Sequence, residues 1–352
     1  MKKKKDIFGK TFDGYLNIRS DFFNKDINDS EVKKLKQIDK FYKKQPKRKG
    51  CKICSKKFKE KLFERNDIKY FVCENCGHLN GEFEDTKDYS EYLYAPKNEN
   101  GEMKIYKDDD KKAYNFRTKN IYLPKAKFLY NQLKDFNEDP LKHKYLDIGS
   151  GTGHMVMAMR NIGLVNSSGC DVTPDNVRFA NNINKTEILK LHKLNEIEKI
   201  ILETEATVIT SIFMLEHVQN PLKLCKAIKK NKNIKYMMLA VPMFSIGVLL
   251  EQAFPQIRKR SLGAGHTHLF TEGSIKWLCK KVNFKILANW WFGADAFDLH
   301  RFINMHFKKD IKKSNLSLTW DKMILPTLNK IQLAFDEQRL SSEIHIFIKV
   351  NS

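Results

Sequence analysis

From residue 144 onward, short apolar runs alternate with stretches in which apolar residues recur at helical spacing. The runs have the length of strands, and the segments between them have the length of helices. This alternation is typical of βαβ units, in which helices cover both faces of a mainly parallel sheet. We therefore predict an α/β fold around a seven-stranded sheet. The predicted strands span residues 144–148, 167–172, 188–192, 207–213, 236–241, 284–291 and 343–350.

The 352 residues exceed the length of one average domain, and their composition changes along the chain. A basic N-terminal arm, residues 1–48, precedes a cysteine-containing module at 49–80 and a tyrosine-rich connector at 81–120. Residues 121–352 hold the predicted sheet. A largely helical insertion is expected at 293–342, before the last strand.

The formal net charge is +22, and much of it lies near the N-terminus. Residues 1–49 hold 16 Lys and Arg against 7 acidic residues, and residues 50–80 hold 7 against 4. A basic arm can bind the phosphates of a nucleic acid. Most of these basic residues are lysines, however, whereas phosphate and base recognition favours arginine. A nucleic acid is therefore an alternative partner that we rank behind a small molecule.

Nothing in the sequence predicts a membrane-spanning or secreted protein. No apolar run approaches the roughly 20 residues that a membrane helix needs. The lysines after Met1 are not followed by the apolar segment of a signal peptide, so we expect a cytoplasmic protein. Its seven cysteines, an odd number, favour metal ligands and free thiols over a disulfide framework. The sequence does not predict the oligomeric state.

Four of the cysteines have the spacing of a zinc ribbon. Cys51 and Cys54 form one pair separated by two residues, and Cys73 and Cys76 form a second pair 18 residues later. Two such pairs hold four thiolates tetrahedrally around Zn²⁺. Because four thiolates leave no open coordination position, we predict a structural zinc site. The ribbon alone does not distinguish protein, nucleic-acid and architectural roles.

The first predicted strand runs into a glycine-rich turn. Glycines at the carboxyl end of such a strand let the backbone approach a bound ligand closely. A dinucleotide fingerprint would place its third glycine at position 154, where this chain has His154. The acidic residue of the turn instead precedes the first glycine by two positions. The residues expected to form the cofactor turn are Asp147, Gly149, Ser150, Gly151 and Gly153.

This turn resembles motif I of class I S-adenosylmethionine-dependent methyltransferases, which have a Rossmann-like sheet. Asp171 ends the second strand, 24 residues after Asp147, at an offset expected of an acid that binds ribose hydroxyls. The segment 215–218, Leu-Glu-His-Val, resembles a segment common in methyltransferases of small molecules. The resemblance implies S-adenosylmethionine as the cofactor. Three further residues complete its expected site: Val172, Asn195 and Ile212.

The resemblance extends from about Cys51 to Lys349. A four-cysteine ribbon, a connector and a methyltransferase sheet recur together in a branch associated with methylation of sugars and with polysaccharide biosynthesis. This implies a sugar or sugar nucleotide as the methyl acceptor. The alternative is an RNA methyltransferase that holds RNA with the ribbon and the basic arm. Such an enzyme would need aromatic residues for stacking, for which Trp290, Trp291 and Phe292 are candidates.

Methyl transfer to a hydroxyl requires a group that removes the acceptor's proton, and histidine is the usual base near neutral pH. His217 follows the fourth strand, where the methyl group is expected. His266 and His268 follow an apolar insertion and resemble a segment of the sugar enzymes. Glu216 is expected to orient His217 or to cap a helix. The sequence does not decide which histidine is the base.

Overall fold

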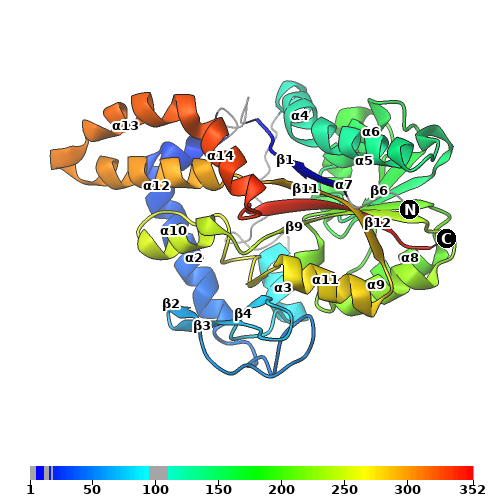
Figure 1. Ribbon diagram of the computed structural model, residues 1–352, viewed down its shortest axis with the longest axis horizontal. Helices are drawn as coiled ribbons and strands as arrows, with labels where there is room; N and C mark the ends of the chain where they lie inside the picture. The colour runs from blue at the N-terminus through cyan, green and yellow to red at the C-terminus, as the bar shows by residue number, and fades with distance from the viewer. Residues whose placement is uncertain (1–4, 12–15, 17–18, 95–109, 352) are drawn as a thin grey trace.

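The computed structural model describes residues 5–11, 16, 19–94 and 110–351. Within them, eight strands form a large sheet in the order β1-β11-β12-β9-β8-β5-β6-β7 (Figure 1). All seven predicted strands are present, so the predicted α/β sheet is confirmed. Their bounds are β5 Tyr145–Ile148, β6 Ser167–Asp171, β7 Leu189–Leu191, β8 Val208–Ile212, β9 Tyr236–Pro242, β11 Lys285–Phe292 and β12 Glu343–Lys349.

The topology places the carboxyl ends of the parallel strands at one edge of the sheet. Strands β5, β6, β7, β8 and β9 pair in parallel, and β12 runs antiparallel between β9 and β11. The chain reverses its sequence order next to β5, where β8 lies on one side and β6 on the other. Ligands of open α/β sheets bind outside such a switch point.

The eighth strand, β1 (Lys5–Phe8), comes from the basic N-terminal arm. It pairs in parallel with β11, beyond the seven predicted strands. The Asn289 side-chain amide donates to Asp6 at 2.7 Å, and the Trp290 indole N–H donates to the Gly9 carbonyl at 2.8 Å. The sequence analysis missed this strand because a run of two apolar residues between charged ones has no readable periodicity.

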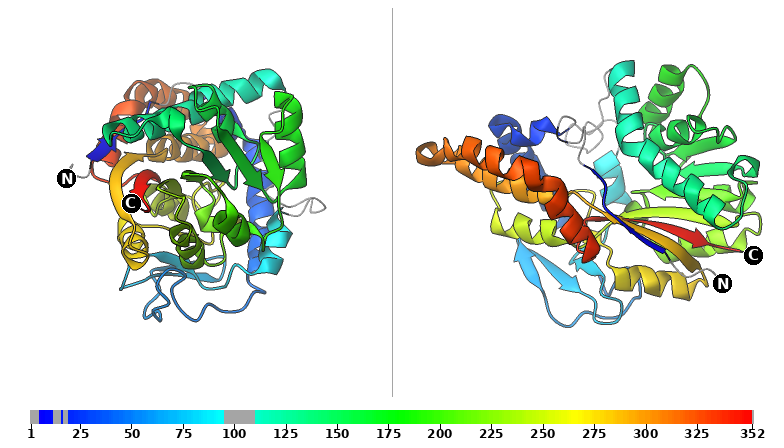
Figure 2. Two further views of the ribbon diagram at one scale, coloured as in Figure 1. Left: turned by 90° about the vertical axis from the view of Figure 1, so that its right-hand side faces the viewer. Right: turned by 45° about the horizontal axis from the view of Figure 1, so that its top comes forward.

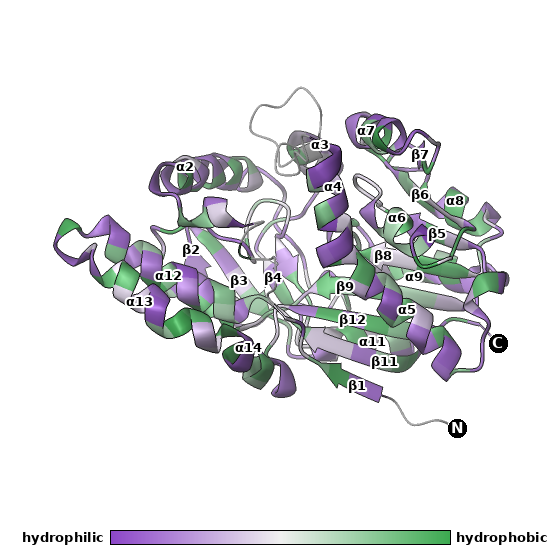
Figure 3. Ribbon diagram, turned by 90° about the horizontal axis from the view of Figure 1, so that it is seen from above, coloured by the Kyte–Doolittle hydropathy of each residue, from purple (hydrophilic) through white to green (hydrophobic). Residues whose placement is uncertain are grey.

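Helices cover both faces of the large sheet, and apolar side chains fill the two interfaces. Figure 1 shows α5 and α6 above the sheet and α9 and α11 below it. Figure 3 shows hydrophobic colour along β12, which is buried between the layers, and hydrophilic colour over much of the outer helix α2. The covering helices are α5 Leu123–Asp135, α6 His154–Arg160, α7 Pro174–Asn184, α8 Ile197–Glu203, α9 Pro221–Lys230 and α11 Glu272–Lys281.

The segment between β11 and β12 forms three helices that extend to one side of the sheet (Figure 2). A 3-10 turn that contains Pro326 separates the last two, as expected of a residue without a backbone N–H. The helices are α12 Asp295–Lys309, α13 Leu316–Ile324 and α14 Leu328–Glu337. Other helices of the described residues are α2 Lys25–Tyr42, α3 Lys87–Tyr94, α4 Lys111–Arg117 and α10 Ile246–Ala253. None of the described helices is long and apolar enough to cross a membrane.

A second sheet joins the cysteine-containing module to the large-sheet region. It contains β2 (Phe63–Arg65), β3 (Ile68–Val72) and β4 (Leu79–Gly81) of the module. Its fourth strand, β10 (His268–Leu269), comes from the segment after β9 and pairs antiparallel with β4. Two regions that are far apart in the sequence therefore share one hydrogen-bonded ladder.

Candidate active site

A cavity of about 1630 Å³ opens at the carboxyl ends of β5, β6 and β8. It is therefore at the switch point of the sheet, where α/β folds bind ligands. Its walls come from the glycine turn, from the segments that follow β6 and β8, and from the loop that precedes β10. Residues singled out from the sequence that line it are Gly149, Gly151, Asp171, Val172, Asn195, His217 and His266.

The glycine turn follows β5 and requires its glycines. Gly149, Gly151 and Gly153 have φ angles of 67°, 53° and 78°, a region that favours glycine. A Cβ atom at Gly149 would lie 2.2 Å from Cγ of Met214, so a larger residue would displace the chain that follows β8. A Cβ at Gly151 would meet nothing within 4 Å, which leaves that peptide open to a ligand.

Asp171 connects the glycine turn to the end of β6. Its two carboxylate oxygens accept the backbone N–H of Gly151 at 2.8 Å and that of Thr173 at 2.9 Å. Burial raises the pKa of this carboxyl from its usual value, and the backbone donors oppose that change. Since each carboxylate oxygen can accept a second hydrogen bond, Asp171 can bind a pair of hydroxyls from the cavity.

Other residues predicted to touch the cofactor lie behind the cavity wall. Asp147 is buried and accepts a hydrogen bond from the Thr210 hydroxyl at 2.5 Å. The Ser150 hydroxyl donates to the Asp147 carbonyl at 2.8 Å. Burial raises the pKa of Asp147 to about 7. Asp147, Ser150, Gly153 and Ile212 are not among the lining residues, and their contact with the cofactor stays a prediction.

His154 stands at the position where a dinucleotide fingerprint has glycine. Its ring stacks between Tyr114 and Tyr122, with ring centroids 4.3 and 5.0 Å away. Its Nδ1 lies 2.8 Å from the Thr118 hydroxyl, and the Tyr114 hydroxyl donates to the Thr152 carbonyl at 3.1 Å. Residues from the connector therefore support the glycine turn from outside.

Glu216, His217 and His266 form a cluster at the cavity wall. The first two lie in a 3-10 turn after β8, Leu215–His217, and the third lies before β10. The Nε2 atoms of His217 and His266 lie 3.8 and 3.9 Å from Oε1 of Glu216. The two rings stack with centroids 5.3 Å apart. Glu216 is fully buried, and neither of its carboxylate oxygens has a hydrogen-bond partner among the described residues.

Burial favours the uncharged form of both Glu216 and His217. It raises the pKa of the Glu216 carboxyl to about 8. It lowers the pKa of His217 to about 3, with smaller contributions from His266 and Lys52. At neutral pH the cluster therefore presents a neutral imidazole to the cavity. The three ligand atoms lie within 4.8 Å of one another, so they can share a proton or a cation.

A hydrogen bond to the backbone orients the imidazole of His266. Nδ1 of His266 lies 3.1 Å from the Ser261 carbonyl, which can only accept, so in the neutral ring Nδ1 carries the proton and Nε2 carries the lone pair. The Ser261 region is held by Glu251, whose carboxylate accepts the N–H groups of Arg260, Ser261 and Leu262 at 2.8, 2.6 and 3.1 Å. This buried carboxylate fixes the loop that carries His266.

The structure does not bring His268 to the cavity. Nε2 of His268 lies 2.7 Å from the Glu216 carbonyl, and Nδ1 lies 2.8 Å from Nε2 of His78. The carbonyl can only accept, so Nε2 of His268 is the donor and Nδ1 accepts from His78. Both ring nitrogens are occupied, and the side chain is fully buried. The position of His268 therefore does not support the expectation that it acts as a base, because its ring bridges His78 and the Glu216 carbonyl.

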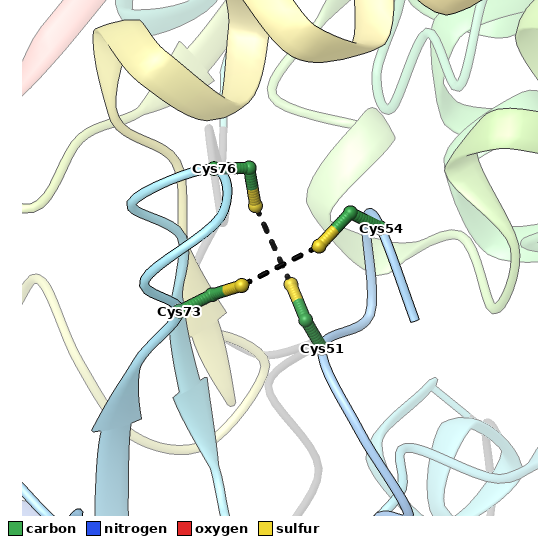
Figure 4. Close-up of side chains that lie close together, drawn as sticks. All are labelled: Cys51, Cys54, Cys73 and Cys76. Carbon is green, nitrogen blue, oxygen red and sulfur yellow. Dashed lines mark hydrogen bonds between the residues drawn. The ribbon is translucent and has the colours of Figure 1, made fainter. Parts of the chain in front are cut away.

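Cys51, Cys54, Cys73 and Cys76 point toward a common centre from two loops of the module (Figure 4). The sulfur atoms of Cys51 and Cys76 are 3.6 Å apart, and those of Cys54 and Cys73 are 3.4 Å apart. Thiolates at zinc are separated by about 3.8 Å when four Zn–S bonds of about 2.3 Å are tetrahedral. The four residues therefore fit a zinc ion with a small adjustment.

The sequence analysis missed several cavity residues. Phe213 and Met214 lie between β8 and Glu216, and His192 directly follows β7. Lys10 and Lys125 reach the cavity from the N-terminal arm and from α5. Their positions depend on how separate helices and strands meet, which no local sequence pattern reports. Phe213 has φ of 56°, a strained backbone that is visible only in the structure.

A family model described as a methyltransferase domain matches residues 117–289, about half of the chain. The matched residues include the glycine turn, Asp171 and the Glu216–His217–His266 cluster. Among curated proteins, no sequence matches this chain.

Similar solved structures are also methyltransferases. The plantazolicin methyltransferase BamL, in complex with a triazolic analog and SAH, is 14% identical over 75% of this chain and 95% of its own, with a TM-score of 0.46. A putative sarcosine dimethylglycine methyltransferase from Galdieria sulphuraria is 12% identical over 65% and 86%, with a TM-score of 0.41. The magnesium protoporphyrin IX methyltransferase from Synechocystis PCC 6803, with bound SAH, is 12% identical over 47% and 74%, with a TM-score of 0.37.

Replacing Asp171 tests the hydroxyl-binding geometry. Asp171→Ala removes the carboxylate that accepts from Gly151 and Thr173 and that faces the cavity. We expect the affinity for S-adenosylhomocysteine to fall by about 2–3 kcal/mol, the scale of charge-assisted hydrogen bonds. Titration calorimetry measures this change, and Asp175→Ala on the exposed start of α7 is the control. Equal affinities of the two variants would show that Asp171 does not bind the ligand.

Proposed function

We propose that this S-adenosylmethionine-dependent methyltransferase methylates a sugar or a sugar nucleotide. The observation that carries the proposal is the Glu216–His217–His266 cluster on the wall of the cavity that also holds Asp171. A hydroxyl acceptor needs a proton acceptor beside the methyl group, and this cluster supplies one. The cavity has room for both a cofactor and a small acceptor.

We propose that the cofactor occupies the part of the cavity formed by the glycine turn and Asp171. Asp171 would accept hydrogen bonds from the ribose hydroxyls, and Val172 and Asn195 would line the adenine side. When bound, S-adenosylmethionine supplies an activated methyl group on a positively charged sulfonium. The protein's remaining task is to hold the acceptor in line with that group and to remove its proton.

His217 and His266 are the proposed proton acceptors, since both line the cavity, and Glu216 supports them from behind. Nε2 of His266 carries a lone pair, because its Nδ1 proton is bound by the Ser261 carbonyl. A backbone hydrogen bond with Gly265 favours the protonated form of His217. The Glu216 carboxylate would stabilise the imidazolium formed when either ring accepts a proton.

The charge of the occupied cavity would activate this cluster. In the unliganded protein the Glu216 carboxyl has a pKa of about 8 because it is buried. A positive charge in the cavity favours the carboxylate and lowers that pKa. Ionised Glu216 in turn raises the basicity of the adjacent imidazoles. Proton removal would thus become efficient only after the cofactor has bound.

The aromatic residues that an RNA enzyme would use for stacking are largely unavailable. Trp291 is completely buried in the interface below the sheet, and Trp290 is buried in the interface above it. Only Phe292 of this group lines the cavity. This arrangement favours a small acceptor over the RNA alternative, because base stacking needs accessible aromatic faces.

We propose a structural zinc ion for the four cysteines. Two contacts within the module support them: the Asn80 amide approaches the Cys51 sulfur at 3.7 Å, and the Gly77 N–H donates to the Cys73 carbonyl at 2.6 Å. The Thr271 hydroxyl, at the start of α11, approaches the Cys76 carbonyl at 3.5 Å. The ion would stiffen the module against α11 and thereby support β4, which pairs with β10.

The acceptor class can be tested with labelled cofactor. The purified protein is incubated with trideuteromethyl S-adenosylmethionine and either the sugar nucleotides or the RNA of a cell extract. We expect mass spectrometry to find label in a sugar nucleotide, with a rate that changes little between 50 and 200 mM salt. Label found only in RNA, with a rate that falls steeply as salt is raised, would contradict the proposal. A steep salt dependence is expected of an RNA complex because RNA binding releases counterions.

The proton acceptor can be tested by pH dependence. In this proposal turnover requires ionised Glu216. The turnover rate should therefore rise with pH as the Glu216 carboxyl loses its proton. The acidic limb in kcat/KM for the cofactor, which reports the free enzyme, should lie near the pKa of about 8. The limb in kcat should lie at lower pH, because the cofactor's charge lowers that pKa. His217→Ala should lower kcat about a hundredfold, as for loss of a general base.

Glu216→Gln should remove the acidic limb together with most of the turnover. His306→Ala, at an exposed position on α12, is the matched control and should behave as the wild type. An unchanged acidic limb in Glu216→Gln would assign the titration to another group.

The zinc proposal predicts the metal content. Purified protein should hold one zinc per chain, and Cys73→Ser should lose it because four thiolates are needed for tight binding. Mass spectrometry of metals measures the content, and Cys279→Ser, in a buried thiol outside the cluster, is the control. Zinc-free wild-type protein with four freely reactive thiols in these positions would rule out the site.

A further inference from the structure

Lys125 is a buried cation at the cavity wall without a matching anion. It lies in the first turn of α5 and is 2% exposed. It lines the cavity. Among the described residues, no carboxylate lies within ion-pair distance of its ammonium group, and no hydrogen bond to it is found. Its near neighbours are aromatic: its Nζ atom lies 4.5 Å from the Phe213 ring centroid and 5.4 Å from that of Tyr122.

Lys10 approaches the same place from the N-terminal arm. Its Nζ atom lies 5.2 Å from the centroid of the Phe292 ring, and that of Lys125 lies 6.0 Å from the same centroid. Both lysines line the cavity, as does Arg117 at the end of α4. The acidic group that acts on both lysines is Glu343, at the start of β12. One buried and one partly buried ammonium group therefore lie near a single carboxylate, which is not within ion-pair distance of Lys125.

This arrangement is costly in an unliganded protein. Burial lowers the pKa of Lys125 to about 7, with Lys10 and Arg117 acting in the same direction. Aromatic faces attract an ammonium group, but they replace only part of its hydration. A buried charge is normally paired, so an unpaired one that faces a cavity indicates a ligand of opposite charge.

We propose that Lys125 and Lys10 form an oxyanion subsite of the cavity. The proposal rests on the proposed function, because that function supplies two candidate anions of the same chemistry. One is the carboxylate at the methionine end of the cofactor. The other is a phosphate of a sugar nucleotide acceptor. Both present oxygen atoms that accept hydrogen bonds from ammonium groups.

The position of the subsite connects it to both ligands. Phe213, over which Lys125 lies, is followed by Met214, and Met214 abuts Gly149 of the glycine turn. Lys125 is therefore beside the part of the cavity that we assign to the methionine end of the cofactor. The ring of Phe292 lies near the ammonium groups of both lysines. Phe292 is the last residue of β11, so its part of the cavity wall comes from a different strand than the glycine turn.

The test compares two ligands that differ at the charged end. S-adenosylhomocysteine has the carboxylate-bearing end, whereas 5′-methylthioadenosine lacks it and keeps the adenosine part. Affinities are measured by calorimetry for the wild type, Lys125→Met and Lys10→Met. Lys127→Met, at an exposed position on the same helix, is the matched control. A second arm measures thermal stabilisation of the protein saturated with S-adenosylhomocysteine by inorganic pyrophosphate.

If the anion is the cofactor's carboxylate, Lys125→Met should weaken S-adenosylhomocysteine about tenfold or more and leave 5′-methylthioadenosine within about twofold. If it is an acceptor phosphate, both nucleoside affinities should stay unchanged, and stabilisation by pyrophosphate should be lost. Equal weakening of both nucleosides, or no difference from Lys127→Met in either arm, would overturn the proposal.

The variants also separate a binding role from a structural one. Since methionine has a similar shape and no charge, Lys125→Met should melt at the same temperature as the unliganded wild type or higher. A lower melting temperature would mean that the charge stabilises the fold, and would overturn the assignment. Binding of S-adenosylhomocysteine by the wild type does not depend on the acceptor. Failure of the subsite is therefore distinguishable from failure of the sugar proposal.

Discussion

A short antiparallel ladder between β4 and β10 joins the cysteine module to the part of the cavity that holds the proposed proton acceptors. The paired residues are His268 with Asn80 and Leu269 with Leu79, and the Gly81 N–H donates to the Thr267 carbonyl at 2.9 Å. His78 and His268 extend the connection to the Glu216 carbonyl. Because His266 lies two residues before β10, the position of this ladder decides where its imidazole meets Glu216.

Two parts of the molecule therefore have separate tasks. The parallel strands β5, β6 and β8 place the glycine turn and Asp171 at one edge of the sheet, so the proposed cofactor site depends mainly on the large sheet and on the connector residues that pack against the turn. Of the two proposed proton acceptors, His217 follows β8 of the large sheet, whereas His266 precedes β10, a strand that pairs with the module. The proposed metal site has no open coordination position and would affect catalysis only by positioning His266.

The strands of the large sheet could be predicted from the sequence because each is a short apolar run between helical segments. The glycine turn and Asp171 were predictable because both follow strand ends in order. Strand β1 was not, since Ile7 and Phe8 gain a partner only through β11. The buried position of His268 and the cavity position of Lys125 were also hidden, because each depends on contacts between residues that are distant in the sequence.

Hydrogen exchange before and after removal of the metal tests this coupling most directly, because it needs no acceptor. In the zinc-stripped protein we expect faster exchange at the amides of β4, of β10 and of the turn that carries Glu216 and His217. The amides of Gly149, Gly151 and Gly153 and the affinity for S-adenosylhomocysteine should stay unchanged. Unaltered exchange along β10 and in the Glu216 turn after complete loss of the metal would contradict the account.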